Sequence, residues 1–580
     1  MKDILINTIQ TLTNEEKSRA YLIIFLSIIA MFLETFGVSL IIPFVALILE
    51  DNIYGIHPFI SNVLVNFGSP QKYQLLIYGF ILLVSFFFIK SSFSSYLIFK
   101  QTRFAYNLRA EISKRLFRTY LNQPFKFFLN ENSAKLIRNI RAETDLYIEI
   151  VINSSLILLS EVMIIIGIII LLLIFEPHGA ILILSIVAAI FLSHQLLTKK
   201  ITKKYAEIRQ YFDGQCIKII QQSLNSIISV KIQSNENLIL SKFKEYADKS
   251  AQAQKFQTAM QELPRLWLEF FALLGLTILV LFLYKSGNTN NQIMTTIGLF
   301  GAAAFKILPS LNRVFVASQK LRFGQPVLSI ILESRKLEKN IKYKIKDLPK
   351  NFSQNILNEN YFLQLKNINF RYQENQKKVF SNTELNLEKN KRIGIYGESG
   401  SGKSTLINLI SGLLKPNEGK ILYYGVEIEK ILGYYHSKLG YVSQNVTLMD
   451  ESIKNNITFF EDDKKVDNQR IEKIIEILEL KEFLNGLPNG LNSIVGENAV
   501  KISGGQKQRL GIARTLYHEP EILILDEATN ALDSETERKI VERIFSIKSI
   551  KNIICISHKM SNLKFCDKIY KISKNEIVIQ

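Results

Sequence analysis

The chain has 580 residues, of which 48% are hydrophobic and 21% charged, and its formal net charge is +19. One hydrophobic core stops growing beyond about 250–300 residues, so this length excludes a single domain. Much of the positive charge lies in segments that join long apolar runs, which predicts membrane and cytosolic parts in one chain and no nucleic-acid partner. The three cysteines, Cys216, Cys555 and Cys566, lack the spacing of a metal site and imply no disulfide framework.

The first part of the chain is the predicted membrane part. Met1–Ala20 is polar, lacks the apolar core of a cleaved signal peptide, and is expected to form an amphipathic helix along the inner membrane surface. Six apolar segments follow, and most of them meet or exceed the ~20 residues that cross a bilayer. They predict an all-α membrane domain of six helices over residues 1–332. The segments are Tyr21–Leu49, Tyr73–Phe99, Ile148–Phe175, Ala180–Leu197, Leu263–Tyr284 and Ile293–Val316.

The loops between these segments differ in charge. Lys100–Tyr147 and Thr198–Glu262 are rich in lysine and arginine, whereas Glu176–Gly179 and Lys285–Gln292 are short and contain one cation. Basic loops remain in the cytosol, so we expect both chain termini to face the cytosol.

The longer connections are expected to contain short helices. In the first outer loop, Pro58–Phe67 has a periodicity that fits a helix on the outer membrane surface. We interpret the two long cytosolic loops as extensions of the membrane helices, each bending back through a transverse helix, at Phe125–Asn132 and at Ile220–Ser226. The alternative is a pair of solvated loops, which is uncommon at this length in compact domains.

A phosphate-binding loop lies in the last part of the chain. Residues 333–360 form a charged linker, and residues 361–580 alternate strand-like and helix-like runs in an α/β pattern. The apolar run Arg392–Tyr396 leads into a glycine-rich loop and a helical pattern, so we expect backbone amides to wrap the phosphates of a nucleoside triphosphate. Lys403 should reach the β- and γ-phosphates, and Ser404 should ligate Mg²⁺. The loop consists of Gly397, Glu398, Ser399, Gly400, Ser401, Gly402, Lys403, Ser404 and Thr405.

Two adjacent carboxylates end a buried-strand pattern. Ile522–Leu525 precedes Asp526 and Glu527. In phosphate-loop enzymes a strand-end aspartate assists Mg²⁺, and the next carboxylate can accept a proton from attacking water. Adjacent strand residues face opposite sides, so the strand end must turn to present both. The alternative is a strand followed by an acidic helix start.

Gln444 and His558 also follow predicted strands. Gln444 can ligate Mg²⁺ or orient water, and His558 can contact the γ-phosphate, although a lone Gln or His is more often structural. Ser503–Gln506 opens the helical pattern Lys507–Tyr517 and offers a second anion site at a helix N-terminus. One nucleotide has one triphosphate, already held by Lys403, so the second site makes sense if it closes on the nucleotide of another copy.

In their order along the chain these motifs, with Ala531-Leu532-Asp533, resemble the ATPase domain of ABC transporters. With six preceding membrane segments, the whole chain resembles an ABC exporter half-transporter of the type IV fold. The resemblance implies an α/β ATPase domain after the six-helix membrane domain, and a head-to-tail homodimer that sandwiches two ATP molecules. It implies Glu527 as general base, His558 as switch and Gln444 as sensor. The transverse helices would couple the domains.

The resemblance also assigns the nucleotide contacts by position. Tyr372 would stack on adenine, and the phosphate loop would hold phosphate. Mg²⁺ contacts would come from Ser404, Gln444 and Asp526. Further ATP contacts would come from Ser503, Gly504, Gly505, Gln506 and Asp533, the first three capping the γ-phosphate of the facing subunit. Glu497 resembles a cross-contact to the transverse helices. Ile502, Asn530 and Lys559 depart from the usual Leu, Ser and Arg, and none of them removes a catalytic group.

Several charges lie in or beside the apolar segments. An intramembrane charge costs ~2.5–3.5 kcal/mol on insertion scales, so it usually faces a transport pathway or a charged partner. Lys90, Arg265 and Lys306 come from three different segments and would suit an anionic head group if cations are in excess. The alternative is a set of structural ion pairs or snorkelling side chains. The charges are Glu34, Lys90, Glu161, Arg265, Glu269, Lys306 and Arg313.

Three membrane motifs resemble those of the bacterial lipid-linked oligosaccharide flippases. They are Glu34-Thr35-Phe36 with Pro43-Phe44, Pro264-Arg265 with Leu268-Glu269, and Leu308-Pro309-Ser310 with Asn312-Arg313. This resemblance implies outward movement of an undecaprenyl-pyrophosphate oligosaccharide for protein glycosylation, in a bacterial plasma membrane. Two alternatives remain open: an exporter of a drug, lipid A or a peptide, and, in another class, an ATP-gated channel or regulatory subunit.

Overall fold

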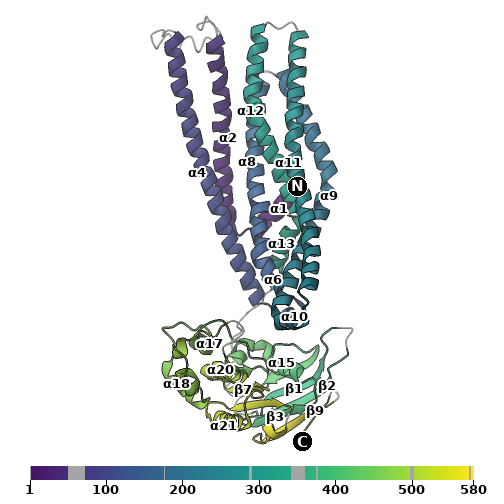
Figure 1. Cartoon of the computed structure of the whole chain (residues 1–580), viewed down its shortest axis with the longest axis vertical. Helices are drawn as coiled ribbons and strands as arrows, with labels where there is room; N and C mark the ends of the chain where they lie inside the picture. Colours follow the sequence, from purple (N-terminus) through teal and green to yellow (C-terminus); the bar gives the residue numbers. More distant parts are fainter. Residues whose placement is uncertain are drawn as a thin grey trace. The chain divides into compact units, whose positions relative to one another are not determined.

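The computed structural model describes residues 2–49, 72–175, 177–285, 290–340, 359–373, 377–496, 502–558, 560–573 and 576–579. The predicted surface helix Pro58–Phe67 and the predicted cross-contact Glu497 lie outside these residues. The chain divides into two compact units (Figure 1). The first comprises Met1–Gln123 and Asn130–Lys342, and the second comprises Pro124–Leu129 and Tyr343–Gln580.

Long helices build the first unit. All six predicted apolar segments are helical, and Pro264 lies inside its helix without ending it. Within the described ranges, five helices are long and apolar enough to cross a membrane, and α9, which contains Ala180–Leu197, is not among them. The long helices are α2 (Asn14–Leu49), α4 (Lys72–Leu121), α8 (Asn153–Phe175), α9 (Pro177–Asn225), α11 (Glu236–Lys285) and α12 (Asn290–Phe323).

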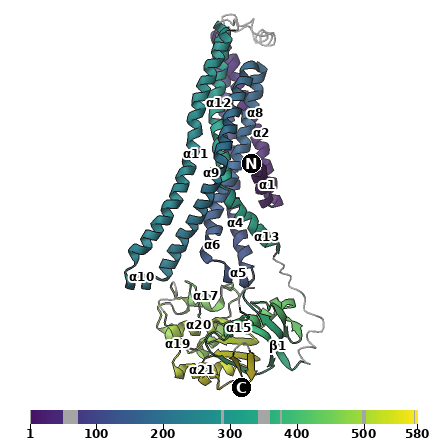
Figure 2. The same ribbon diagram turned by 90° about the vertical axis from the view of Figure 1, so that its right-hand side faces the viewer.

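Shorter helices join the long ones. The chain passes from α4 to α8 through α5 (Phe125–Asn130), α6 (Ser133–Arg138) and α7 (Thr144–Leu146), with a π-helical turn on either side of α7. α10 (Ile227–Gln233) joins α9 to α11, and these two long helices run side by side (Figure 2). After α12, α13 (Gln325–Asn340) ends the first unit.

The position predicted for the second transverse helix was wrong. A short helix, α5, does occupy the first predicted position. At the second, residues 220–225 are instead the last turns of α9, and the short helix is α10, which begins after Ser226. It ends at Ser234 in a left-handed conformation with φ of 53°. Because neither flanking residue is a glycine or a proline, the usual sequence signal of a turn is missing.

The N-terminal prediction of one surface helix was also wrong. Helix α1 (Lys2–Thr11) ends before Thr13, and α2 starts at Asn14. Thr13 Oγ1 accepts from the Glu16 amide at 3.3 Å, and Glu16 Oε2 accepts from the Thr13 amide at 2.7 Å. This reciprocal capping box starts a new helix.

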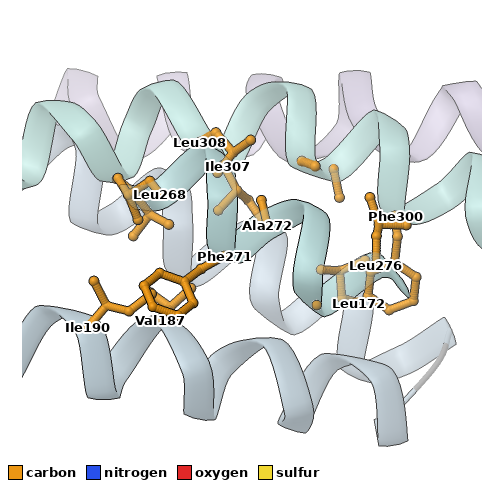
Figure 3. A pocket seen from close by; sticks show the side chains of 14 residues that line it. Leu172, Val187, Ile190, Leu268, Phe271, Ala272, Leu276, Phe300, Ile307 and Leu308 are labelled. Carbon is orange, nitrogen blue, oxygen red and sulfur yellow. The ribbon is translucent and has the colours of Figure 1, made fainter. Parts of the chain in front are cut away.

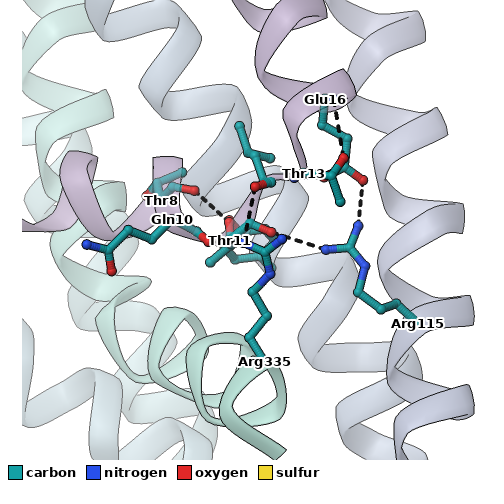
Figure 4. A network of polar contacts seen from close by, with 9 residues as sticks. Thr8, Gln10, Thr11, Thr13, Glu16, Arg115 and Arg335 are labelled. Atoms are coloured by element: carbon teal, nitrogen blue, oxygen red, sulfur yellow. Dashed lines mark hydrogen bonds and ion pairs between the residues drawn. The ribbon is translucent and has the colours of Figure 1, made fainter. Parts of the chain in front are cut away.

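Polar contacts hold α1 against other helices (Figure 4). The Arg335 guanidinium of α13 donates to the carbonyl oxygens of Gln10 and Leu12. The fully buried Tyr147 hydroxyl lies 2.6 Å from Thr11 Oγ1. Helix α1 is therefore packed into the helical unit, which a free amphipathic helix would not be.

The second unit contains two sheets. The antiparallel sheet has the order β2-β1-β4-β5, and the larger sheet has the order β10-β9-β3-β8-β7-β6. The strands are β1 (Tyr361–Phe370), β2 (Phe380–Glu388), β3 (Arg392–Gly397), β4 (Glu418–Tyr423), β5 (Val426–Glu427), β6 (Leu439–Val442), β7 (Ile522–Asp526), β8 (Asn552–Ser557), β9 (Lys568–Ser573) and β10 (Glu576–Ile579). The longer helices are α15 (Lys403–Ile410), α16 (Leu432–Lys438), α17 (Ile453–Thr458), α18 (Asn468–Ile477), α19 (Lys481–Asn485), α20 (Gly504–Tyr517) and α21 (Ser534–Phe545).

The larger sheet is buried on both faces, which explains its continuous apolar runs. In β7, Ile522 and Ile524 join one hydrophobic core, and Leu523 and Leu525 join the other. Strands β6, β7, β8 and β3 pair in parallel, so their carboxyl ends meet at one edge. That edge is where a doubly wound sheet binds its ligand. The structure thus has the fold class that the sequence predicts: a region of long helices followed by an α/β domain.

Candidate functional site

The phosphate loop joins β3 to α15. Gly400 and Gly402 have φ of 80° and 99°, backbone angles that residues other than glycine rarely adopt. A Cβ at Gly397 would lie 2.7 Å from Ser401 Oγ and 2.8 Å from the Ile572 carbonyl oxygen, so this turn also has no space for one. The loop therefore keeps its amides around the N-terminus of α15, as an anion site requires.

Lys403 and Ser401 fit a triphosphate. The Lys403 ammonium donates to the carbonyl oxygens of Gly397 at 2.7 Å and Glu398 at 2.8 Å, which holds a positive charge over the loop. Ser401 Oγ is buried and has no hydrogen-bond partner among the described residues. Ser404 is exposed in the first turn of α15, where an Mg²⁺ ligand is predicted. The Tyr372 hydroxyl lies 3.0 Å from Thr405 Oγ1, and its stacking on adenine stays a prediction.

The two strand-end carboxylates have different surroundings. Asp526 is buried at the end of β7 and accepts from the Tyr441 hydroxyl at 3.2 Å. Burial raises the pKa of the Asp526 carboxyl and the Glu527 carboxylate adds to this rise, while Tyr441 and Lys403 oppose it. Glu527 has φ of 49°, so the backbone turns at the strand end, as predicted.

Three side chains surround the Glu527 carboxylate. Gln444 donates to Glu527 Oε2 at 2.7 Å, and Asn530 donates to the same oxygen at 3.0 Å. His558 Nδ1 lies 3.4 Å from Glu527 Oε1. The structure thus brings together the three residues predicted to be catalytic, which come from the ends of β6, β7 and β8. The sequence marked Asn530 only as a departure from a family pattern, and it proves to be a direct partner of Glu527.

Arg514, which the sequence analysis missed, fixes the segment after Gln444. Its guanidinium donates to the Thr447 carbonyl at 3.0 Å, and to the Asn456 carbonyl and side-chain oxygens at 2.8 and 2.9 Å. Asn456 is buried and donates in turn to the Met449 carbonyl at 3.0 Å. The signal was an arginine among the apolar residues of the last turn of α20.

The second predicted anion site caps α20. Ser503 Oγ accepts from the Gln506 amide, and Gln506 Oε1 accepts from the Ser503 amide, which makes a capping box. A Cβ at Gly505 would lie 3.1 Å from the Ala531 carbonyl oxygen, so glycine allows the close approach of the next loop. Asp533 accepts from the Thr536 amide as the N-cap of α21. The ATP contacts predicted for Ser503–Gln506 and Asp533 stay predictions.

The charges of the membrane helices are paired. Glu34 is buried, and its oxygens lie 3.0 Å from Lys90 Nζ and 2.9 Å from Lys306 Nζ. Arg265 pairs with Glu269 one turn along α11, and Arg313 makes two hydrogen bonds to Glu161. Four cations thus face three carboxylates, which leaves an excess of one positive charge.

Some of these cations line a cavity of about 620 Å³ between α11 and α12. Arg265, Lys306 and Arg313 line it together with one carboxylate, Glu269. Asn312, whose buried Oδ1 has no partner among the residues described, also lines it. Lys90 is not among its lining residues.

The helical unit also contains a smaller, apolar cavity of about 60 Å³ (Figure 3). It is lined from α8, α9, α11 and α12, and its wall includes Leu172, Val187 and Phe271. Leu268, Ala304 and Leu308 line both cavities. The cationic cavity and the apolar cavity therefore share part of their wall.

Both units match models of known protein families. The ABC transporter family model matches residues 380–530, and the model for the ABC transporter transmembrane region matches residues 19–305. The ATP-dependent lipid A-core flippase of Photobacterium profundum is 25% identical over 553 residues, which cover 95% of this chain and 91% of the flippase. The flippase of the same name from Pseudomonas aeruginosa is 39% identical over 217 residues, covering 37% of this chain and 36% of that protein.

A solved structure of a bacterial Atm1-family ABC exporter with ATP bound shares the fold. Its TM-score is 0.80 at 19% identity, and the match covers 98% of this chain and 95% of the exporter. The phosphate loop, the residues around Glu527 and the two family matches lead to one conclusion. The chain belongs to the ABC transporter family, as a multi-pass membrane half-transporter whose ATPase domain binds and hydrolyses ATP to drive export.

Proposed function

We propose that the chain forms a homodimer that flips a polyprenyl-pyrophosphate-linked oligosaccharide from the cytosolic to the outer leaflet, for protein glycosylation. The membrane is a bacterial plasma membrane, and both chain termini face the cytosol. The observation that carries the proposal is the cavity lined by Arg265, Lys306 and Arg313, which shares the wall residues Leu268 and Leu308 with an apolar cavity.

This combination matches the two chemical parts of such a substrate. A pyrophosphate is anionic and suits guanidinium groups, which offer paired donors, whereas a polyprenyl chain needs an apolar surface. The carboxylates that pair with Arg265 and Arg313 hold the two guanidinium groups in place until an anionic group of the substrate competes for them. Asn312 adds an acceptor for a sugar hydroxyl.

In the ATPase domain, we assign Ser404, Gln444 and Asp526 to Mg²⁺, because hydroxyl, amide and carboxylate oxygens are the ligands that this ion prefers. Mg²⁺ would neutralise charge on the transferred phosphoryl group. Glu527 accepts a proton from the attacking water, and Gln444, Asn530 and His558 orient its carboxylate. In the homodimer, Ser503, Gly504 and Gly505 of each copy cap the γ-phosphate held by the phosphate loop of the other.

Lipid A export is the second candidate, because the named relatives are lipid A-core flippases. ATPase activity of the purified chain in lipid nanodiscs distinguishes the lipid-linked glycan from lipid A as the substrate. We expect undecaprenyl-pyrophosphate oligosaccharide to stimulate hydrolysis more strongly than lipid A-core or the monophosphate carrier does. Stimulation by lipid A-core alone would reject the glycan substrate and retain the exporter.

A further inference from the structure

A second cationic cavity lies between α2 and α4, away from the helices that line the proposed transport cavity. Its volume is about 360 Å³, and α2 and α4 pack side by side along it (Figure 1). Its floor is apolar, with Ile23, Phe104 and Leu108 buried. Its rim includes the cations Arg19, Lys100 and Arg103.

The rim carries an excess of positive charge. None of these three cations pairs with a carboxylate in the part of the chain that the structure describes, and Lys100 lies over the Tyr96 ring at 5.3 Å. One of the two carboxylates on the rim, Glu16, is already used: it pairs with Arg115 and accepts from the Thr13 amide (Figure 4). Glu111 is the other, so one carboxylate remains on the rim for three cations.

The cations stand at the ends of apolar runs. Arg19 lies just before the run that starts at Tyr21, Lys100 directly follows the run that ends at Phe99, and Arg103 lies one turn beyond it. A membrane-spanning helix places such positions at the level of the lipid head groups. Leu22 and Leu26, one and two turns further into the apolar run, continue the cavity wall toward the hydrocarbon region.

We propose that this cavity binds an anionic glycerophospholipid, with its phosphodiester between Arg19 and Arg103 and an acyl chain along Leu22 and Leu26. Guanidinium groups bind phosphate through paired hydrogen bonds, and the cytosolic leaflet supplies anionic lipid. The bound lipid would add a further link between α2 and α4 beside the ion pair of Glu16 and Arg115. The site is separate from the transport cavity, so the inference does not depend on which molecule is exported.

The test uses the full-length chain purified in detergent, with phosphatidylglycerol as the probe and phosphatidylcholine as the zwitterionic comparison. Native mass spectrometry measures lipid retained per chain. The variant Arg19→Gln/Arg103→Gln should retain phosphatidylglycerol about fivefold less for each cation removed. The matched control Lys114→Gln/Arg118→Gln changes the net charge equally on exposed α4 positions outside the cavity, and it should retain lipid as the unmodified chain does.

A gain-of-binding variant keeps the test decisive if the arginine variant folds poorly. Glu111→Gln removes the remaining carboxylate from an exposed position and should increase phosphatidylglycerol retention. Inorganic phosphate should not displace the lipid, because it lacks the acyl chain. Equal retention by the arginine variant and its control, or no change in Glu111→Gln, would overturn the proposal. The same result is expected if a second copy of the chain, and not a lipid, covers the cavity. Displacement by inorganic phosphate would instead assign the cavity to a free anion.

Discussion

The side-chain amide of Gln444 donates a 2.7 Å hydrogen bond to Oε2 of Glu527, across 83 residues of sequence. The contact joins the end of β6 to the end of β7, so the predicted sensor and the predicted general base already touch within one chain. Because Asn530 shares the same oxygen, the Glu527 carboxylate is held from two sides.

Replacing Glu527 by Gln should stop ATP hydrolysis while ATP still binds. General-base catalysis contributes roughly 10²–10⁴-fold, so we expect turnover to fall by at least about 100-fold. ATP affinity should change little, because the substitution keeps the side chain's size. Glu542→Gln, on an exposed ion pair of α21, is the matched control and should hydrolyse ATP normally. Normal turnover by the Glu527 variant would assign the base to another residue.

Asn530 should set the position of the base. Asn530→Ala removes one of the two amide donors to Glu527, and a hydrogen bond of this kind contributes about 1 kcal/mol, so kcat should fall roughly fivefold. KM for ATP should not change, since Asn530 does not belong to the phosphate loop. Asn530→Ser supplies a shorter donor and should recover part of the rate. An unchanged kcat in the Ala variant would mean that Gln444 alone positions the carboxylate.

Glu34 should stabilise the helical unit far more than Glu269 does. Glu34→Gln leaves Lys90 and Lys306 without their shared carboxylate, and breaking a buried ion pair costs about 3–5 kcal/mol. Glu269→Gln breaks an exposed pair within one helix, which contributes about 0.3–0.5 kcal/mol. Thermal unfolding of the full chain in detergent measures both. Equal effects would show that Glu34 does not hold the two lysines.

The cations proposed for substrate binding can be tested together. An Arg265/Lys306/Arg313 triple Ala variant, in which Glu34 keeps Lys90 as its partner, should lose stimulation of ATPase activity by the lipid-linked glycan but keep its basal activity. The variant Glu34→Gln/Lys90→Met/Lys306→Met separates the structural role of the two lysines from substrate binding. It removes the buried ion pairs of Glu34 and leaves Arg265 in the cavity. Full stimulation of the triple Ala variant would refute a cationic pathway.

Glu521 should stabilise the ATPase domain in a pH-dependent way. It lies 2.6 Å from both Lys438 and Lys551, at the ends of β6, β7 and β8 opposite to the catalytic residues. Burial of Glu521 opposes ionisation, but the two lysines outweigh it and lower the pKa of the carboxyl below its ordinary value of 4.5. The stabilisation is therefore complete above pH 4.5 and lost as the pH falls through the lowered pKa.

We expect Glu521→Gln to cost roughly 0.5–1 kcal/mol at pH 7 and to match the unmodified chain in acid. The midpoint of thermal unfolding, followed from pH 7 to pH 3, measures this difference. Glu472→Gln, at an exposed position of α18, should show no such pH dependence. A difference that persists in acid would mean that the effect is not electrostatic.

Local patterns predicted the catalytic parts of this fold well. The phosphate loop is continuous in sequence, and its glycines, Lys403 and Ser404 have fixed spacing, so a local pattern identifies it. The turn at Glu527 followed from strand geometry, since only a turn can present two adjacent carboxylates.

Features that depend on distant or weakly marked contacts were not predicted. The polar pattern of Met1–Ala20 predicts one continuous helix, whereas the capping box of Thr13 and Glu16 separates α1 from α2. The turn between α9 and α10 carries no glycine or proline, and helical pattern alone continued across it. The pairing of Lys90 with Glu34 joins two helices, and a single sequence does not state which faces meet.

The central claim is that ATP hydrolysis moves a pyrophosphate-linked glycan across the bilayer, and flipping in proteoliposomes measures it most directly. Chains that expose their ATPase domains outward should use external ATP to move labelled undecaprenyl-pyrophosphate oligosaccharide inward, where an impermeant glycosidase cannot cleave it. We predict protection that requires ATP and Mg²⁺ and that is absent with Glu527→Gln. Glycan that stays fully cleavable while the chain hydrolyses ATP would contradict the account.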